Sequence, residues 1–272
     1  NNKIYLTYSK DIDGNGATTL ATVEFDQKNK KIKNFNQVKI FQAQTSTSRH
    51  FGSRMAFNAK EKALYLSIGD RGDRKNGQNT LSHAGTILKL DYTGKPHSSN
   101  PYLKNKKYLP EIYSYGHRNP QGIFFLKEKN ELWSTEHGPR GGDELNKIEA
   151  GKNYGWPIVT YGKEYWGPLQ VGETTHGRKG MQDPKYQYTP SIAPSSLMIY
   201  QGSKFPKWKN LFFISALKHK HINVLTFDPK SPKGVEFKLF LKLGQRIRHL
   251  AESPLGDIWF STDSGRLYQI TK

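Results

Sequence analysis

Short runs of alternating apolar and polar residues recur along the chain, and they constrain its fold more than any other feature. Successive side chains of a β-strand point to opposite faces of a sheet, so alternation over four to eight residues indicates a strand. Helical periodicity is almost absent, which predicts an all-β protein. The five clearest runs, each closed by a small or acidic residue, are Lys3–Thr7, Ala63–Asp70, Glu131–Glu136, Asn210–Ser215 and Asp257–Asp263.

Most of these runs are followed by a second strand-like segment that often ends in Asp. The aromatic positions of the five runs are separated by 60, 68, 79 and 47 residues. One hairpin-like unit in each long, uneven repeat predicts a β-propeller with loop insertions, a single domain over residues 1–272 with about five visible blades. A β-sandwich, which also has many short strands, is the alternative. The second segments are Ala21–Asp26, Thr86–Asp91, Asn223–Asp228 and Arg266–Ile270.

Composition excludes several classes of protein. Fifteen Tyr, 14 Phe and 5 Trp supply a sizeable core, which argues against a disordered chain. The apolar runs are far shorter than the roughly 20 residues of a membrane helix, so we expect no membrane span. With no Cys there are no disulfides, no thiolate catalysis and no Cys-ligated metal.

The net charge is strongly positive, with 42 Lys and Arg against 23 Asp and Glu, or +19. Such a charge attracts polyanions in general. The basic residues are scattered singly and do not form a stripe on one helix. We therefore expect a solvated basic surface and no nucleic-acid partner.

A Gly-rich acidic segment, Glu136–Glu144, directly follows one predicted strand. Gly and Pro hold such a loop in a tight turn whose carbonyl oxygens can point outward, and Asp143 and Glu144 add hard oxygen atoms. These are the ligands that Ca²⁺ requires. The same composition also suits a turn with no metal.

Two other segments have simpler interpretations. Asp11–Gly16 is similar to the start of a calcium loop, but Thr22 stands where the acid at position twelve belongs, so we expect a hairpin turn. Arg71-Gly72-Asp73 predicts only an exposed loop.

Two loops carry polar side chains suited to catalysis. His50 precedes a predicted strand and is a candidate general base, and Asp70, at the end of the strand that follows, could orient its imidazole. The loop Gly116–Gly122 places four polar side chains between two glycines. Its Arg118 and Asn119 would suit a ligand rich in carbonyl or carboxylate oxygens. Each loop could instead be purely structural.

Three cations near strand ends could form an anion site. Arg246 and Arg248 are two residues apart on a predicted strand and therefore point to the same face. Lys218 follows another strand. If these side chains converge, they would bind a polyanion; ordinary surface charge is the alternative.

Taken together and in this order, these segments resemble the soluble pyrroloquinoline quinone (PQQ)-dependent aldose and glucose sugar dehydrogenases, especially their bacterial aldose sugar dehydrogenase branch. The resemblance covers nearly the whole sequence. It rests on Arg49–Arg54, Ser67–Asp70, Tyr113–Gly122, Glu136–Asn146, Lys152–Pro157, Ser191–Ser195, Ala216–Lys218 and Gln245–Arg248.

The resemblance implies a six-bladed propeller that binds PQQ and Ca²⁺ and oxidises aldoses at C1 to the lactone. His50 matches the base that takes the C1 hydroxyl proton while hydride moves to quinone carbon C5, and Asp70 matches its partner. Arg118 and Asn119 match residues beside the reactive quinone oxygen. The remaining matches are Ser191, Lys218, Arg246 and Arg248 for the cofactor, the carbonyls of Gly138 and Pro139 for the catalytic Ca²⁺, and Glu144 and Tyr154 for a second, structural Ca²⁺.

The sequence departs from the family at its beginning. Family members carry a further stretch before the equivalent of Lys3–Thr7, which supplies the first blade and a Gln near the cofactor. We therefore expect either part of a longer protein or a ring closed with five blades.

The resemblance also implies partners and location. We expect an aldose substrate, a quinone, dye or small redox protein as electron acceptor, a monomer or homodimer, and a periplasmic or secreted protein whose export signal lies outside this sequence. Two other functions remain open, a non-catalytic binding module and a calcium-dependent lactonase on a similar propeller.

Overall fold

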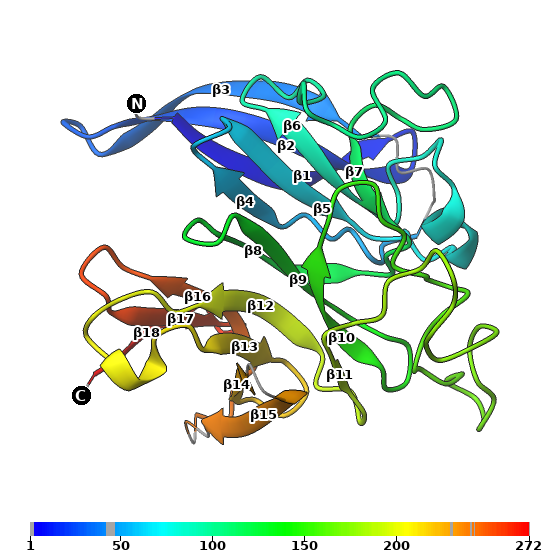
Figure 1. Ribbon diagram of the computed structural model, residues 1–272. Helices are drawn as coiled ribbons and strands as arrows, with labels where there is room; N and C mark the ends of the chain where they lie inside the picture. Colours follow the sequence, from blue (N-terminus) through cyan, green and yellow to red (C-terminus); the bar gives the residue numbers. More distant parts are fainter. Residues whose placement is uncertain (1–2, 42–46, 229–230, 240, 242, 272) are drawn as a thin grey trace. The chain divides into compact units, whose positions relative to one another are not determined.

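The structure is a computed structural model that describes residues 3–41, 47–228, 231–239, 241 and 243–271. Within these residues the regular structure consists of β-strands and two short 3-10 helices, and the strands form five antiparallel sheets of three or four strands each (Figure 1). In every sheet, strands consecutive in sequence are neighbours, which is the arrangement of a propeller blade. The prediction of an all-β propeller with about five visible blades is confirmed.

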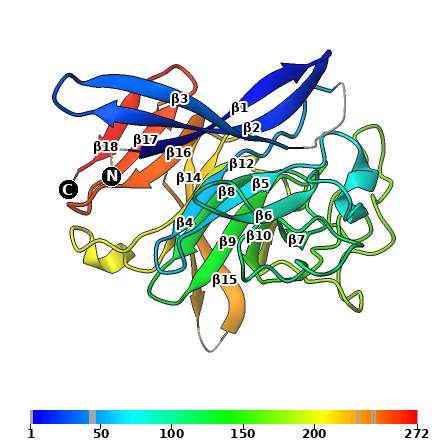
Figure 2. The same cartoon turned by 90° about the horizontal axis from the view of Figure 1, so that it is seen from above.

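The chain divides into two compact units. The first comprises Asn1–Asn119 and Glu149–Pro157. Its first sheet consists of β1 (Lys3–Ile12), β2 (Asn15–Asp26) and β3 (Lys31–Ile40), drawn as long ribbons in Figures 1 and 2. Its second sheet consists of β4 (Met55–Asn58), β5 (Ala63–Ile68), β6 (Thr86–Asp91) and β7 (Ile112–Tyr115), with helix η1 (Arg74–Gln78) between β5 and β6.

The second unit comprises Pro120–Ile148 and Ile158–Lys272. One of its sheets consists of β8 (Pro120–Leu126), β9 (Glu131–Glu136), β10 (Asp143–Ile148) and β11 (Tyr186–Tyr188). Another consists of β12 (Pro194–Ile199), β13 (Phe212–Ala216), β14 (Ile222–Asp228) and β15 (Ser231–Leu239), with helix η2 (Pro206–Trp208) between β12 and β13. The last consists of β16 (Ile247–Glu252), β17 (Ile258–Thr262) and β18 (Leu267–Ile270).

The five alternating runs of the sequence coincide with β1, β5, β9, β13 and β17. The expected turn at Asp11–Gly16 joins β1 to β2, where Ile12 pairs with Asn15. Asp13 and Gly14 between them have positive φ angles of 50° and 79°, as a two-residue hairpin turn requires. Strand β8 begins at Pro120, so the end of the polar loop Gly116–Gly122 already belongs to a strand.

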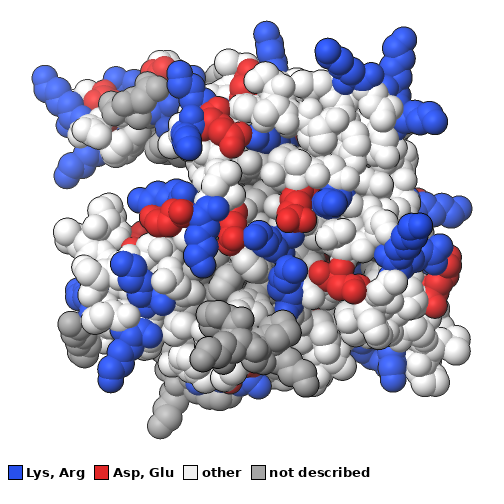
Figure 3. All heavy atoms as spheres, viewed as in Figure 1, with Lys and Arg blue, Asp and Glu red and all other residues white. Residues whose placement is uncertain are grey.

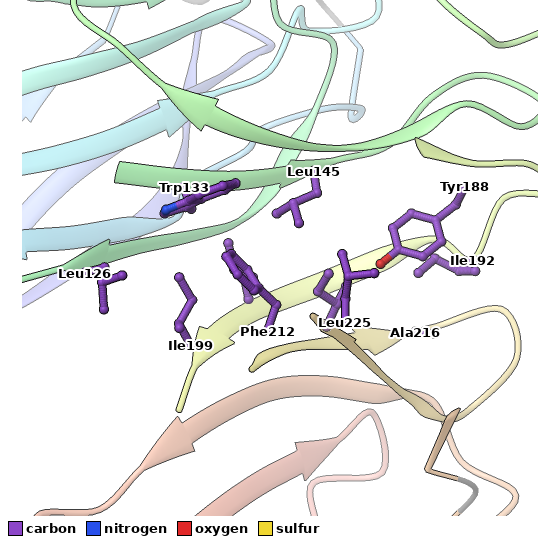
Figure 4. Packing of buried hydrophobic residues seen from close by; sticks show 11 residues of the cluster. Leu126, Trp133, Leu145, Tyr188, Ile192, Ile199, Phe212, Ala216 and Leu225 are labelled. Carbon is purple, nitrogen blue, oxygen red and sulfur yellow. The ribbon is translucent and has the colours of Figure 1, made fainter. Parts of the chain in front are cut away.

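The core of the second unit lies between neighbouring sheets. Apolar side chains of β8–β11 meet those of β12–β15, and the rings of Trp133 and Phe212 make an edge contact with centroids 4.8 Å apart (Figure 4). In the first unit, every residue of β5 is buried because both faces of its sheet are covered. Burial of each large apolar side chain contributes about 1.5–3 kcal/mol, so these cores fix the strand ends that carry the loops described below.

Some charged side chains are buried, among them Asp70, Arg71, Lys89 and Asp143, and others lie on the surface. Figure 3 shows Lys and Arg side chains scattered over one face, with Asp and Glu between them. No helix among the described residues is long and apolar enough to cross a membrane.

An ion pair joins the two sheets of the first unit. Lys39 of β3 donates to Glu111, and His83 lies 3.4 Å from the other carboxylate oxygen. Burial alone would raise the pKa of Glu111, but the hydrogen bonds from His83 and Lys39 outweigh it and lower the pKa to about 2.

Because this pKa is lowered in the folded state, the ionised form of Glu111 stabilises the fold above its ordinary pKa, and that contribution is lost as the pH falls from about 4.5 towards 2. We expect urea unfolding to show about 1–3 kcal/mol of acid-dependent stability that Glu111→Gln removes. An unchanged pH dependence in the variant would contradict this.

Candidate active site

His50 and Asp70 form a direct pair in the first unit. His50 Nδ1 lies 2.6 Å from Asp70 Oδ1, and the side chains are 18% and 1% exposed. The carboxylate also accepts hydrogen bonds from the backbone N–H of Gly72 and the indole N–H of Trp156, each at 2.8 Å. Since a carboxylate only accepts, the imidazole hydrogen belongs on Nδ1 and the lone pair on Nε2. This is the tautomer that a general base requires.

The loop that carries His50 packs directly against the end of β5. A Cβ at Gly69 would lie 2.4 Å from the carbonyl oxygen of His50 and 3.0 Å from that of Arg118, so only glycine permits this approach. On the loop, a Cβ on Gly52 would lie 2.8 Å from the carbonyl oxygen of Ser67. The fold thereby brings the His50 loop and the loop of Arg118 to one strand end.

Trp156 connects the predicted acid–base pair to Arg118. Its indole N–H donates to Asp70, and the guanidinium carbon of Arg118 lies 5.3 Å from its ring centroid. Arg118 and Asn119 are both buried, and the Asn119 Oδ1 atom lies 3.0 Å from the position of a Cβ on Gly69. The structure therefore joins His50, Asp70 and Arg118, with Asn119 beside them.

Trp156 was not predicted as a site residue. The segment Lys152–Pro157 contributed only to the family resemblance, and Trp156 is 86 residues from Asp70. The one feature of the sequence that could have pointed to Trp156 is its indole N–H, which needs a hydrogen-bond acceptor when the side chain is buried.

In the second unit, Asp143 organises the Gly-rich segment Glu136–Glu144, which was predicted to bind Ca²⁺ and is called the calcium turn below. One carboxylate oxygen accepts the backbone N–H of Gly138 at 2.9 Å. The other accepts the Ser191 hydroxyl at 2.6 Å and the backbone N–H groups of Ile192 and Ala193, each at 2.8 Å. Asp143 is fully buried. Both of its oxygens therefore hold the turn and the Ser191 loop together, and the carboxylate acts as a brace in this structure.

The turn itself is packed backbone against backbone. A Cβ on Gly138 would lie 2.3 Å from the carbonyl oxygens of Gly141 and Gly142. A Cβ on Gly162 would lie equally close to the ring of Pro139. The backbone positions of Gly138 and Pro139 are therefore fixed by glycines at three neighbouring positions.

A pocket of about 450 Å³ opens beside this turn. It brings together three of the predicted residues, Pro139, Ser191 and Lys218, and its described lining contains three cations and no acidic side chain. This composition suits a ligand with several carboxylates. The cations Arg140 and Lys163 were not predicted. The full lining is Pro139, Arg140, Gly141, Tyr161, Lys163, Tyr165, Thr189, Pro190, Ser191 and Lys218.

Backbone hydrogen bonds hold Lys218 next to the Ser191 loop. The N–H of Lys218 donates to the carbonyl of Ile192 at 3.2 Å, and that of Leu217 to the carbonyl of Ala193 at 2.9 Å. The Ser191 loop is therefore bonded to Asp143 and to the segment that carries Lys218, and these contacts fix this wall of the pocket.

Arg246 and Arg248 reach a different partner in the same unit. Both guanidinium groups contact Asp263, and Arg248 binds it through two nitrogens at 2.7 and 3.1 Å. The hydrogen bond from Arg248 lowers the pKa of Asp263. The sequence predicted both arginines on one strand, but β16 begins at Ile247, so Arg246 lies just before it. Neither arginine belongs to the described lining of the pocket.

The residues predicted for a second Ca²⁺ belong to different units. Burial and the neighbouring Glu136 raise the pKa of Glu144 well above its ordinary value, and the Asn146 amide donates to both carboxylates at 3.0 and 3.1 Å. The Tyr154 hydroxyl accepts the backbone N–H of Glu149 at 2.9 Å. Among the described residues, no group of three or more His, Asp or Glu side chains is gathered as a metal-binding set.

The chain is similar in sequence to known sugar dehydrogenases. The family model described as glucose/sorbosone dehydrogenase matches residues 1–269. Aldose sugar dehydrogenase YliI of Escherichia coli is 35% identical over 99% of this chain and 73% of its own length. Quinoprotein glucose dehydrogenase B of Acinetobacter calcoaceticus is 25% identical over 79% of this chain and 59% of its own length, so the match spans less than two thirds of that relative.

Solved structures of sugar dehydrogenases also share the fold. The crystal structure of the soluble aldose sugar dehydrogenase of Escherichia coli in its apo form superposes with a TM-score of 0.90 at 34% identity. The superposition covers 96% of this chain and 75% of that one.

Proposed function

Because the chain belongs to the glucose/sorbosone dehydrogenase family and one of its relatives is named a quinoprotein glucose dehydrogenase, we propose that it oxidises aldoses at C1 to the lactone, with His50 as the general base. The observation that carries the proposal is the 2.6 Å contact between His50 and Asp70, which orients the imidazole with its lone pair on Nε2.

The pocket of the second unit fits PQQ by its chemistry. PQQ carries three carboxylates, and the pocket lining supplies Arg140, Lys163 and Lys218 with no acidic side chain. Its volume of about 450 Å³ lies in the usual range of small-molecule sites. A Ca²⁺ there would depend on backbone carbonyls such as those of Gly138 and Pro139 and on ligand oxygens, because the residues described around the pocket include no carboxylate. We therefore propose that this pocket binds PQQ together with Ca²⁺.

When bound, PQQ would supply the hydride acceptor, quinone carbon C5, for the hydrogen at C1, and Ca²⁺ would supply a Lewis acid that polarises the quinone. His50 takes the proton of the C1 hydroxyl at Nε2, and Asp70 stabilises the imidazolium that results. Arg118, with Asn119 beside it, offers positive charge to the oxygen on which negative charge develops. Lys218, Arg246 and Arg248 are proposed to bind the cofactor carboxylates, and Ser191 to contact the cofactor.

We propose that electrons pass to a quinone, dye or small redox protein, that the protein is a monomer or homodimer, and that it acts in the periplasm or outside the cell. Glu144 and Tyr154 are proposed to serve a second, structural Ca²⁺.

The test is a titration of PQQ and Ca²⁺ into the purified protein, followed by absorbance and by aldose oxidation with an artificial acceptor. We expect an absorbance change and a lactone product. Absorbance that does not change would favour a binding module, whereas consumption of added lactone would favour a lactonase.

Removing cofactor-binding cations should weaken PQQ binding. Loss of one charged hydrogen bond costs about 1.5–3 kcal/mol, so Arg248→Ala and Lys218→Ala should each raise the PQQ dissociation constant by roughly 10- to 150-fold. Arg266→Ala, which removes an exposed cation beside β18, is the control and should leave it unchanged. Equal affinity in all three variants would refute these cofactor contacts.

A further inference from the structure

Arg71 is fully buried, whereas the next two residues, Gly72 and Asp73, are exposed. The prediction of an exposed loop is therefore wrong for Arg71 itself. Its guanidinium group donates to three backbone carbonyls. One nitrogen donates to Arg49, and the other to Gly16 at 2.9 Å and to Thr47 at 2.8 Å. The planar guanidinium group can serve several acceptors at once, which an ammonium group on a flexible chain does not reproduce.

The same guanidinium group also stacks on an aromatic ring. Its carbon lies 3.5 Å from the ring centroid of Phe51. A Cβ on Gly16 would lie 2.8 Å from that ring, so the glycine makes room for the stack. In return, the Thr47 hydroxyl donates to the carbonyl oxygen of Arg71 at 2.9 Å. Arg71 thus contacts the residues immediately before and after His50.

The backbone of His50 needs such support. His50 has a φ of 54° and Ser53 a φ of 63°, in the left-handed region that ordinary residues rarely adopt. Such a conformation costs about 1–3 kcal/mol and persists only where its surroundings enforce it. The end of β5 packs against the loop through the close approaches at Gly52 and Gly69. Arg71 holds the loop through its hydrogen bonds to the carbonyls of Arg49 and Thr47.

Burial lowers the pKa of Arg71, and the neighbouring Asp70 opposes the shift. A cation removed from water in this way is retained only where its hydrogen bonds compensate for the lost hydration. Asp70 and Arg71 are adjacent in the chain, so one dipeptide orients the imidazole ring through Asp70 and the loop backbone through Arg71.

We propose that Arg71 is a positioning residue that holds the His50 loop so that the imidazole keeps its hydrogen bond to Asp70 and presents Nε2 to the sugar. This inference rests on the proposed function for its kinetic consequence, but its structural part concerns the cofactor-free protein alone.

The test begins with proton NMR of the cofactor-free protein. The short His50–Asp70 bond should give a far-downfield exchangeable proton, assigned by its loss in His50→Gln. In Arg71→Lys, which keeps the charge but not the fork of donors, we expect this resonance to vanish or broaden. In the loaded enzyme, kcat should fall by about 100-fold, as misplacement by about 1 Å can cause, with KM and PQQ affinity within twofold.

Lys89→Met is the matched control. Lys89 is also a buried cation of the first unit, but it donates to Glu61 and Ser99, away from the His50 loop. The control should lose stability yet keep the downfield proton and kcat. Added methylguanidinium should restore part of the resonance in Arg71→Ala, which a general loss of stability would not allow.

If Arg71→Lys does not fold, Thr47→Val tests the same tether. It removes the bond from the Thr47 hydroxyl to the Arg71 carbonyl and the 3.3 Å bond that this hydroxyl accepts from the backbone N–H of Arg49, but it keeps the guanidinium group, so it should broaden the resonance more weakly. A wild-type resonance and wild-type kcat in the folded variants would overturn the proposal. An NMR change without aldose oxidation by the wild type would reject the proposed function and leave the positioning role standing.

Discussion

Replacing His50 by alanine is expected to lower kcat for aldose oxidation by about 10²- to 10⁴-fold, the usual contribution of a general base. Without the imidazole, the C1 hydroxyl proton must pass to water while hydride leaves the same carbon. PQQ binding should change little, because the cations proposed to hold its carboxylates lie elsewhere in the chain. Stopped-flow reduction of the bound cofactor, with PQQ titrated separately, measures both quantities.

Two further variants sharpen this prediction. Asp70→Asn keeps the shape of the side chain but can present an amide donor to His50 Nδ1, which favours the wrong tautomer, so a large loss of kcat is again expected. His97→Ala removes a histidine that bonds Ser99 and the Glu61 carbonyl, and it should leave kcat unchanged. Wild-type turnover in His50→Ala would show that the base assignment is wrong.

The strand pattern was predictable from sequence because it is local. Alternation identified β1, β5, β9, β13 and β17, whose side chains face a packed layer. Strand β3 was not predicted from the sequence. Its first seven residues are exposed, and polar or basic side chains interrupt the alternation. Its partner is β2, and pairing of this kind depends on a neighbouring strand that a sequence window does not contain.

The candidate site was predictable only in part, for a related reason. His50 and Asp70 stand out as chemical groups, and the family resemblance supplied their pairing. The residues that brace the site stand out less, because their role depends on long-range contacts. Trp156 meets Asp70 across 86 positions, and Asp143 meets Ser191 across 48. Arg71 seemed exposed because its burial requires Gly16, Thr47 and Phe51 to close around it.

Removing the Asp143 carboxylate is expected to have the largest effect on stability. Its two buried oxygens accept hydrogen bonds from Gly138, Ser191, Ile192 and Ala193. In Asp143→Ala these four donors lose this acceptor. The N–H groups of Gly138 and Ile192 are buried, and a buried donor left unsatisfied costs about 1–3 kcal/mol. Because water can enter and satisfy some of them, we expect a loss of about 3–5 kcal/mol in the free energy of unfolding, measured by urea denaturation.

The same change should also weaken cofactor binding, because Asp143 holds the calcium turn against the Ser191 loop and Lys218 is bonded to that loop. Asp143→Asn tests the point without creating a cavity, since an amide has one acceptor oxygen where four donors converge. Asp183→Ala is the control. Among the described residues, this exposed carboxylate accepts hydrogen bonds from the backbone N–H of Gly177 alone, and its loss should change stability by about 0.5 kcal/mol or less. Asp143→Asn could instead unfold at the same urea concentration as the wild type and bind PQQ equally well. The turn would then not depend on this carboxylate, and the close packing of Gly138 against Gly141 and Gly142 alone would have to fix the shape of the turn.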